Sequence, residues 1–147
     1  MDSSKSSKSD KAYNSLVRML YRRDHSVLEL KNKLTQWYTD EAVRDAIQRA
    51  QDREYIKEPE FLSKQFGEAL HRKEKGIYYI NNALKKKGLP PLPTDPDREL
   101  SKCRELLQKK YGDQENLTTP LRVKAFRYLT SRGFDSETIN KAIHNKF

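Results

Sequence analysis

A ten-residue frame recurs three times in this 147-residue chain and constrains its fold more than any other feature. Residues 30–39, 80–89 and 125–134 each place an apolar residue four positions before a leucine. Four positions after that leucine, the second and third copies have a glycine followed by an apolar residue, whereas the first copy has Tyr38 in the glycine position. The two apolar positions lie one helical turn apart, and the glycine suits the left-handed turn that ends a helix. Recurrence at about 45–50 residues predicts a tandem array of helical repeats.

The rest of the chain also follows the helical period, and no segment alternates apolar and polar residues over the length of a strand. The sequence therefore predicts an all-α fold. The most specific signal for a helix start is at the second helix, where Ser26 and Glu29 form a capping box. The apolar stripes of the second and fourth helices include Trp37, Phe61 and Gln65, so we expect these side chains to face the core. The helices are expected to begin near residue 11 and near Ser26, Asp40, Glu58, Gly76, Asp95, Thr119 and Ser136, with Asp40 as the cap of the third helix.

Two segments lack the helical pattern. Residues 1–10 consist almost wholly of Ser, Lys and Asp, and we expect a disordered tail because they have almost no apolar surface to bury. Residues 88–96 read GLPPLPTDP, in which the prolines remove backbone donors, so residues 90–94 should contain no helix. Hydrophobic residues make up 35% of the chain and charged residues another 35%. Such a thin core favours an elongated array in which each repeat packs only on its neighbours.

The net charge of +9 indicates a polyanionic partner. Nucleic acid is the preferred candidate, with an anionic membrane surface or an acidic protein as alternatives. Cys103 is the only cysteine, which excludes an intramolecular disulfide and a thiolate zinc cluster. No apolar run approaches membrane-spanning length, and the start MDSSKSSKSD lacks the apolar core of a signal peptide. We therefore expect no membrane association and a cytoplasmic location, although a nucleus would fit nearly as well.

The sequence offers no arrangement of residues that is typical of catalysis. His25, His71 and His144 lie in separate segments, with no histidine or cysteine at metal-ligand spacing. The glycines never cluster into a phosphate-binding loop, and the acidic residues have basic neighbours or capping positions. We predict a protein that is no enzyme and that has no metal, no cofactor and no bound ATP.

The basic clusters are the candidates for function. They recur near helix ends, where cations also stabilise the helix dipole without any ligand, so this structural explanation stands beside the functional one. Tyr78 and Tyr79 lie between two clusters and are candidates for stacking on bases, although one of them is expected to fill a gap between helices. The residues predicted to contact nucleic acid or a filament are Arg22, Arg23, Arg72, Lys73, Lys75, Lys85, Lys86, Lys87, Lys109, Lys110 and Arg132.

Five segments together resemble one family. Residues 23–34 read Arg-x-His-Ser-x2-Glu-Leu-x2-Lys-Leu, and residues 53–61 read Arg-Glu-Tyr-Ile-Lys-Glu-Pro-Glu-Phe. Residues 75–89 read Lys-Gly-Ile-x2-Ile-x3-Leu-x2-Lys-Gly-Leu, residues 107–110 read Leu-x-Lys-Lys, and residues 132–139 read Arg-Gly-Phe-x2-Glu-x-Ile. In this order and spacing they are similar to the motifs of the RecX family, small regulators of the RecA recombinase. The resemblance covers about residues 11–147.

The resemblance implies three tandem three-helix repeats in a curved array that lies in the groove of the RecA–DNA filament. There it would inhibit ATP hydrolysis and strand exchange, which places it among the proteins of recombination, DNA repair and the SOS response. The implied partners are the RecA filament and single- or double-stranded DNA, bound by a monomer. On this basis we divide the chain into a tail (1–10) and repeats 1 (11–57), 2 (58–94) and 3 (95–147).

The chain departs from the family pattern at two places. Residues 90–96, PPLPTDP, stand where family members usually carry the third helix of the middle repeat, so that helix is expected to be shortened or replaced by a proline-rich loop. Lys57 and Glu58 replace a pair of aspartates at the first junction. Two other functions stay open: a free-standing, nonspecific DNA-binding module, and a HEAT-like protein scaffold with two helices per unit.

Overall fold

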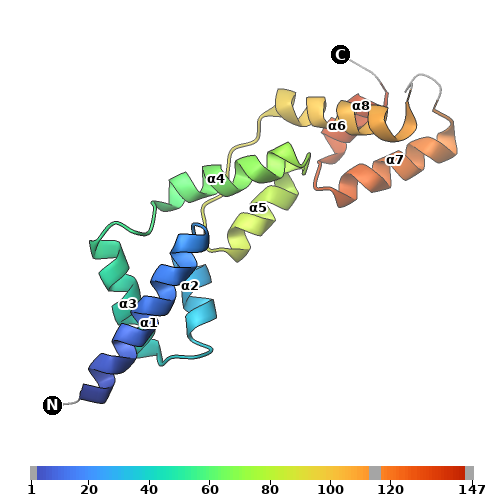
Figure 1. Ribbon diagram of the computed structural model, residues 1–147. Helices are drawn as coiled ribbons and strands as arrows, with labels where there is room; N and C mark the ends of the chain where they lie inside the picture. The colour runs from blue at the N-terminus through green and yellow to red at the C-terminus, as the bar shows by residue number, and fades with distance from the viewer. Residues whose placement is uncertain (1–2, 113–116, 145–147) are drawn as a thin grey trace. The chain divides into compact units, whose positions relative to one another are not determined.

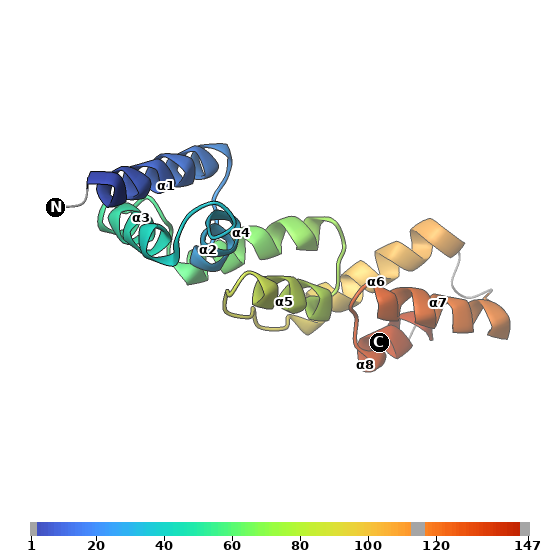
Figure 2. The same ribbon diagram turned by 90° about the horizontal axis from the view of Figure 1, so that it is seen from below.

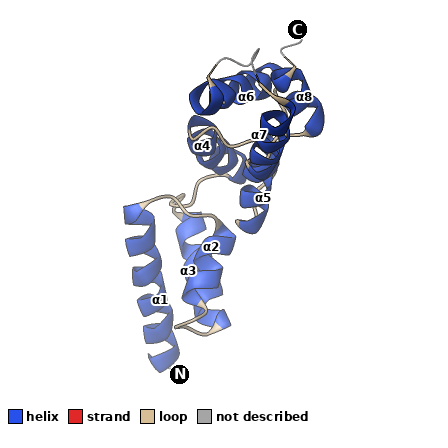
Figure 3. Cartoon of the chain, turned by 90° about the vertical axis from the view of Figure 1, so that its right-hand side faces the viewer, coloured by secondary structure: helices blue, strands red, loops and turns tan. Residues whose placement is uncertain are grey.

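The computed structural model describes residues 3–112 and 117–144, and it contains helices and no strands in those ranges. This confirms the all-α prediction (Figures 1 and 3). The chain divides into two compact units, residues 1–63 with 85–90 (unit 1) and residues 64–84 with 91–147 (unit 2), so the division falls within α4 and α5. The described helices are α1 (Ser3–Arg22), α2 (Val27–Leu34), α3 (Asp40–Asp52), α4 (Pro59–Arg72), α5 (Ile77–Lys86), α6 (Pro96–Tyr111), α7 (Thr119–Ser131) and α8 (Ser136–Ile143).

In unit 1, α1 packs along α3, and α2 closes a three-helix core (Figure 2). The apolar stripes predicted for these helices supply that core, with Leu16, Leu30 and Val43 among its fully buried members. The structure corrects the prediction of a disordered tail, because α1 begins at Ser3. Extending an existing helix costs much less than starting one, and the Asp10 carboxylate also binds Arg49 Nη1 of α3 at 2.9 Å. Met1 and Asp2 lie outside the described residues.

The helix starts follow local side-chain chemistry. Ser26 and Glu29 form the predicted capping box of α2, since each side chain accepts from the backbone amide of the other residue. Asp40 was the wrong cap for α3, because the Thr39 hydroxyl accepts from the Ala42 amide at 3.2 Å and Asp40 is already helical. Its carboxylate then lies in the first turn, where it stabilises the helix dipole.

Three predicted core side chains are exposed. Trp37 is 75% exposed because α2 ends at Leu34, before the stripe reaches it. On α4, Leu62 and Ser63 are buried, whereas Phe61 is 52% exposed and Gln65 is exposed as well. The inward face of α4 is therefore rotated relative to the one that the apolar pattern predicts.

The repeated frame has a structural role, and unit 1 shows it first. The end of α5 packs on the start of α2, where the Ser26 hydroxyl donates to the Lys87 carbonyl at 2.6 Å. Gly88 turns the chain there with a φ of +70°, against the side chain of Leu28, and Leu89 is buried behind it. The glycine and the apolar residue of the frame thus join one repeat to the one before it.

Unit 2 contains a second joint of the same kind, between α7 and α5. The end of α7 packs on the start of α5, where the Gly76 amide donates to the Arg132 carbonyl at 2.8 Å and the Tyr78 amide donates to the Gly133 carbonyl at 3.0 Å. Gly133 has a φ of +100°, and Phe134 is buried. In the frame at residues 30–39, Tyr38 has no positive φ and instead shares a 2.7 Å hydrogen bond with Ser15 of α1. This copy of the frame therefore packs within its own three-helix set.

The core of unit 2 lies among α6, α7 and α8, where Cys103, Leu107, Leu129 and Ile139 are fully buried. A buried polar cluster on α6 holds the α4–α5 turn against this core. It consists of an ion pair between Glu99 and Lys102, in which Glu99 Oε1 accepts from the Ile77 amide at 2.7 Å and Lys102 Nζ donates to the Lys75 carbonyl at 2.7 Å. The Lys75 carbonyl within the turn and the Ile77 amide at the start of α5 are therefore both satisfied by side chains of one helix.

Residues 90–94 contain no helix, as the prolines predict. In unit 1 the Ser63 hydroxyl donates to the Pro90 carbonyl at 2.6 Å. In unit 2 the Asn81 amide group bonds both the amide and the carbonyl of Leu92, at 2.8 and 3.0 Å. These side chains replace the hydrogen bonds that a helix would have made within itself.

Candidate nucleic-acid interface

The predicted basic residues fall into two groups, those that are held by the protein itself and those that face solvent without a partner. In unit 1, Arg23 and Lys87 belong to the first group. Both bind Glu29, Arg23 Nη2 at 2.9 Å and Lys87 Nζ at 2.8 Å, and the Glu29 side chain is only 15% exposed. These two cations therefore stabilise the joint between α5 and α2 and cannot be counted as contacts for a ligand.

The Glu29 carboxyl reflects this environment in its pKa. Burial raises the pKa, but the hydrogen bonds from Arg23, Lys87 and the Ser26 amide outweigh burial and lower it from 4.5 to about 2. The carboxylate is therefore charged at every pH at which the protein is expected to work. A charged, nearly buried group at this position makes the joint depend on both cations.

Lys85 and Lys86 lie in the last turn of α5 and are exposed, and neither forms an ion pair with any described residue. Arg22, in the last turn of α1, is exposed in the same way. It borders a polar groove of about 590 Å³ that also includes Asn32 and Lys33 of α2. Lys33 is an exposed cation in the last turn of α2 that was not among the predicted contacts, because no basic residue is adjacent to it in the sequence.

In unit 2 both kinds of cation lie at the α4–α5 turn, some in or next to it and others on the helices packed against it. Arg72 and Lys73 are exposed and have no ion pair within the described part of the chain. Arg132 is held by backbone carbonyls of the same turn, with Nη2 2.7 Å from the Lys73 oxygen and 3.4 Å from the Glu74 oxygen. Lys109 binds Glu74 at 2.5 Å. Arg132 and Lys109 therefore stabilise the turn that presents Arg72 and Lys73.

Aromatic rings accompany the cations of unit 2. Lys75 Nζ lies 4.6 Å from the centre of the Tyr79 ring, and Lys110 Nζ lies 3.8 Å from the centre of the Tyr128 ring. The backbone and Cβ of Tyr79 lie against Gly133, but its side chain is 41% exposed, so the expectation that one of the two tyrosines fills a gap between helices stays a prediction. Tyr78, in the first turn of α5, is 61% exposed. An exposed ring of this kind can stack on a nucleic-acid base.

The histidines and the cysteine lie apart from one another and form no common site among the described residues. His25 Nδ1 is 3.0 Å from the Arg23 carbonyl and His71 Nδ1 is 2.8 Å from Lys102 Nζ, and burial lowers the pKa of both rings. Burial also raises the pKa of the Cys103 thiol to about 12. Within residues 3–112 and 117–144, no three histidine, cysteine or acidic side chains gather so as to hold a metal ion. None of the described helices combines the length and the apolar character that crossing a bilayer demands.

Comparisons with known proteins agree with the helical repeats. Two family models match, the first three-helix domain of RecX at residues 12–49 and the third three-helix domain at residues 97–143. The regulatory protein RecX of Legionella pneumophila (strain Corby) is 29% identical over 138 residues, which covers 89% of this chain and 91% of the relative. That of Acinetobacter baylyi is 31% identical over 131 residues, which covers 86% of this chain and 82% of the relative.

Two solved structures share the fold. The crystal structure of RecX from Lactobacillus salivarius superposes with a TM-score of 0.79 at 17% sequence identity, covering 95% of this chain and 97% of the other. A second crystal structure, of a regulatory protein RecX, superposes with a TM-score of 0.77 at 17% identity, covering 97% of this chain and 74% of the other.

Proposed function

Because the chain belongs to the RecX family of regulatory proteins, we propose that it regulates the RecA recombinase by binding in the groove of the RecA–DNA filament. Bound there, it suppresses ATP hydrolysis and strand exchange. It acts as a monomer in the bacterial cytoplasm and catalyses no reaction of its own. The family supports the role of regulator, and the surface chemistry supports the contact with DNA in the filament.

The DNA contact is inferred from one observation: some surface cations are bound by acidic groups of the protein, and others are not. Arg72 and Lys73 in unit 2, and Lys85 and Lys86 in unit 1, have no acidic partner among the described residues. Unpaired surface cations release counterions when they meet phosphates, which is the main source of affinity for nucleic acid. Tyr78 adds a stacking surface and favours single-stranded DNA, whose bases are accessible.

The decisive test is the ATPase activity of RecA on single-stranded DNA, with and without this protein. We expect the protein to lower the rate, and Arg72→Gln with Lys73→Gln to require a higher concentration for the same effect. The matched control is Lys124→Gln with Arg127→Gln, which removes two exposed cations of α7 that lie outside the α4–α5 turn. An unchanged ATPase rate at saturating protein would refute the proposed function.

A free-standing DNA-binding module is the second candidate, and the unpaired cations and the exposed Tyr78 favour it equally. Affinity for bare single-stranded DNA, compared with affinity for a RecA-coated strand at the same salt concentration, separates the two functions. Tighter binding to the coated strand supports the regulator, and equal or weaker binding supports the module. A HEAT-like scaffold is disfavoured, because α1–α3 pack as a set of three helices and so do α6–α8.

A further inference from the structure

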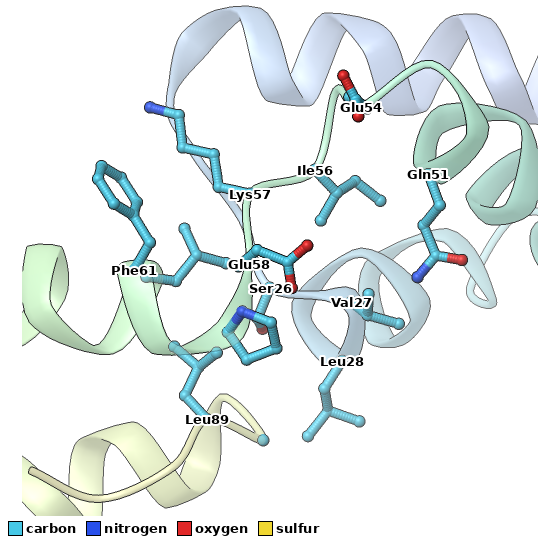
Figure 4. A pocket seen from close by; sticks show the side chains of 13 residues that line it. Ser26, Val27, Leu28, Gln51, Glu54, Ile56, Lys57, Glu58, Phe61 and Leu89 are labelled. Atoms are coloured by element: carbon cyan, nitrogen blue, oxygen red, sulfur yellow. The ribbon is translucent and has the colours of Figure 1, made fainter.

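Unit 1 contains an open groove of about 700 Å³ beside the joint between α5 and α2. The first turns of α2 and α4 border it, and the segment between α3 and α4 crosses it. Figure 4 shows Ile56 and Glu58 near its middle, Leu28 and Leu89 on one side, and Phe61 at one end. The volume is within the range of sites that hold small molecules or a few side chains of a bound protein segment.

The groove presents apolar side chains that remain partly exposed in the fold. Phe61 is 52% exposed, and Val27 and Leu28 of the capped turn are 38% and 37% exposed. Phe61 and Val27 lie outside the core cluster of unit 1, whereas Ile56 packs on that cluster and Leu28 lies against Gly88 at the joint. Exposed apolar side chains that gather around one groove mark a surface for binding a partner.

The charge at the groove is opposite to that of the whole chain. Glu54 and Glu58 are exposed, and no described residue forms an ion pair with either carboxylate. Lys57 is the one cation among the residues that line the groove, and its Nζ is bound to the Asp24 carboxylate at 2.8 Å. In a chain of net charge +9, this local negative field repels phosphates and attracts a cationic partner.

The wall of the groove is formed before anything binds. Glu54 has a φ of +57° at the end of α3, and this left-handed turn is fixed by hydrogen bonds from the Glu54 amide to the Gln51 carbonyl and from the Tyr55 amide to the Ala50 carbonyl, both 2.9 Å. The Ser26–Lys87 hydrogen bond fixes the opposite side. A site that is already ordered loses little conformational entropy on binding.

We propose that this groove binds a protein segment in which an apolar side chain stands next to a lysine or arginine. The apolar side chain packs against Phe61, Ile56 and Leu28, and the cation pairs with Glu58 or Glu54. This inference rests on the proposed function, in which the segment belongs to the RecA filament. Contacts with the protein and with the DNA of the filament are then made by different surfaces, an acidic apolar groove and unpaired cations.

The test measures binding of full-length variants to two probes by fluorescence anisotropy. The probes are bare poly(dT) and cognate RecA assembled on poly(dT) with a slowly hydrolysed ATP analogue. Phe61→Ala should weaken binding to the filament by at least about tenfold, because it removes the largest apolar contact. Its affinity for bare poly(dT) should stay within about twofold of the wild type. Glu58→Lys should also weaken binding to the filament, whereas its affinity for bare poly(dT) should stay the same or rise.

The controls are Tyr21→Ala, which removes a 92% exposed aromatic ring that does not line the groove, and Glu60→Lys, which reverses an exposed charge next to Phe61 outside the groove. Circular dichroism establishes that each variant is folded. Unchanged filament binding by Phe61→Ala and Glu58→Lys would overturn the inference and leave the proposed function intact. An equal loss of binding to both probes would instead assign the groove to DNA. Dissociation of a wild-type dimer by Phe61→Ala would assign it to a second copy of the chain. Failure of the wild type to bind the filament would overturn both proposals.

Discussion

Lys86 and Lys87 are neighbours in the sequence, yet only Lys86 is available to a ligand. The Lys87 side chain is 28% exposed and bound to Glu29, while Lys86 is exposed and has no ion pair with any described residue. The same division separates Arg22 from Arg23, and Arg72 and Lys73 from Arg132. At the residue scale, a basic cluster therefore mixes groups that hold the fold with groups that can bind phosphates.

The cluster at residues 85–87 allows a direct test of this division. Lys85→Gln with Lys86→Gln should weaken DNA binding and make the slope of log affinity against log salt less negative by about 0.7–0.9 for each phosphate that the variant no longer binds. Its free energy of unfolding should change little. Lys87→Gln should do the reverse, lowering the free energy of unfolding by about 1–3 kcal/mol because Glu29 loses a charged partner while staying partly buried. Salt titrations and urea unfolding of both variants decide, and identical behaviour of the two would contradict the division.

At the element scale, two joints connect helices that are apart in the sequence, α5 with α2 and α7 with α5. In each joint, the glycine that ends the later helix packs on the start of the earlier one. A β-carbon on Gly88 would press on the side chain of Leu28, which can adjust. On Gly133 it would collide with the backbone nitrogen of Tyr79, which cannot. The joint in unit 2 is therefore the less tolerant one.

Alanine substitutions should follow that order. Gly112 has a φ of +70° and a ψ of −133°, a conformation that is essentially confined to glycine, and no atom lies within 4 Å of the added carbon, so Gly112→Ala should cost only the backbone strain, about 1–3 kcal/mol. Gly133→Ala should cost more than Gly88→Ala, about 3 kcal/mol or more. Urea unfolding followed by circular dichroism measures the stability of the three variants. Equal costs would show that the backbone conformation alone sets them.

Acid should weaken the joint in unit 1 through Glu29. The pKa of this carboxyl in the folded state, about 2, is below its usual value of 4.5. The unfolded chain therefore binds the proton more readily, so the stabilisation is present above pH 4.5 and is lost as the pH falls towards 2. Glu29→Gln should be less stable than the wild type at pH 7 and should lose less stability over that range. Thermal unfolding measured from pH 7 to pH 2 gives both curves, and parallel curves would contradict the assignment.

At the scale of the whole molecule, two three-helix sets, α1–α3 and α6–α8, lie in different compact units, and the helices between them are divided between the units. The repeat boundaries at residues 57 and 94 stay a prediction. The elongated form of the array is a prediction as well, because it was inferred from the thin core of the sequence.

Small-angle X-ray scattering checks that inference. A compact chain of this length should have a radius of gyration of ~15 Å, and an array of repeats should exceed that value. A measured value at or below ~15 Å would show that the repeats fold back on one another.

The helices and the glycine turns that end two of them were largely predictable from the sequence, because the signals that set them are local. The Ser26–Glu29 capping box, the prolines at 90–96 and the glycines at 88 and 133 each act within a few residues, so pattern and spacing were enough. Local signals failed where two alternatives were nearly equal, as for the cap at Thr39 or Asp40. They failed again where a helix ended before its stripe did, as at Trp37.

The candidate sites were decided by the tertiary structure. Whether a cation is free depends on an acidic side chain brought from far along the chain: Glu29 lies 58 residues from Lys87, and Glu74 lies 35 residues from Lys109. The acidic groove likewise combines residues from α2, from the segment before α4 and from the end of α5. Sequence by itself determined the all-helical fold and the excess of positive charge. Only folding determined which charges neutralise one another, since pairing depends on distance in space and not on order in the chain.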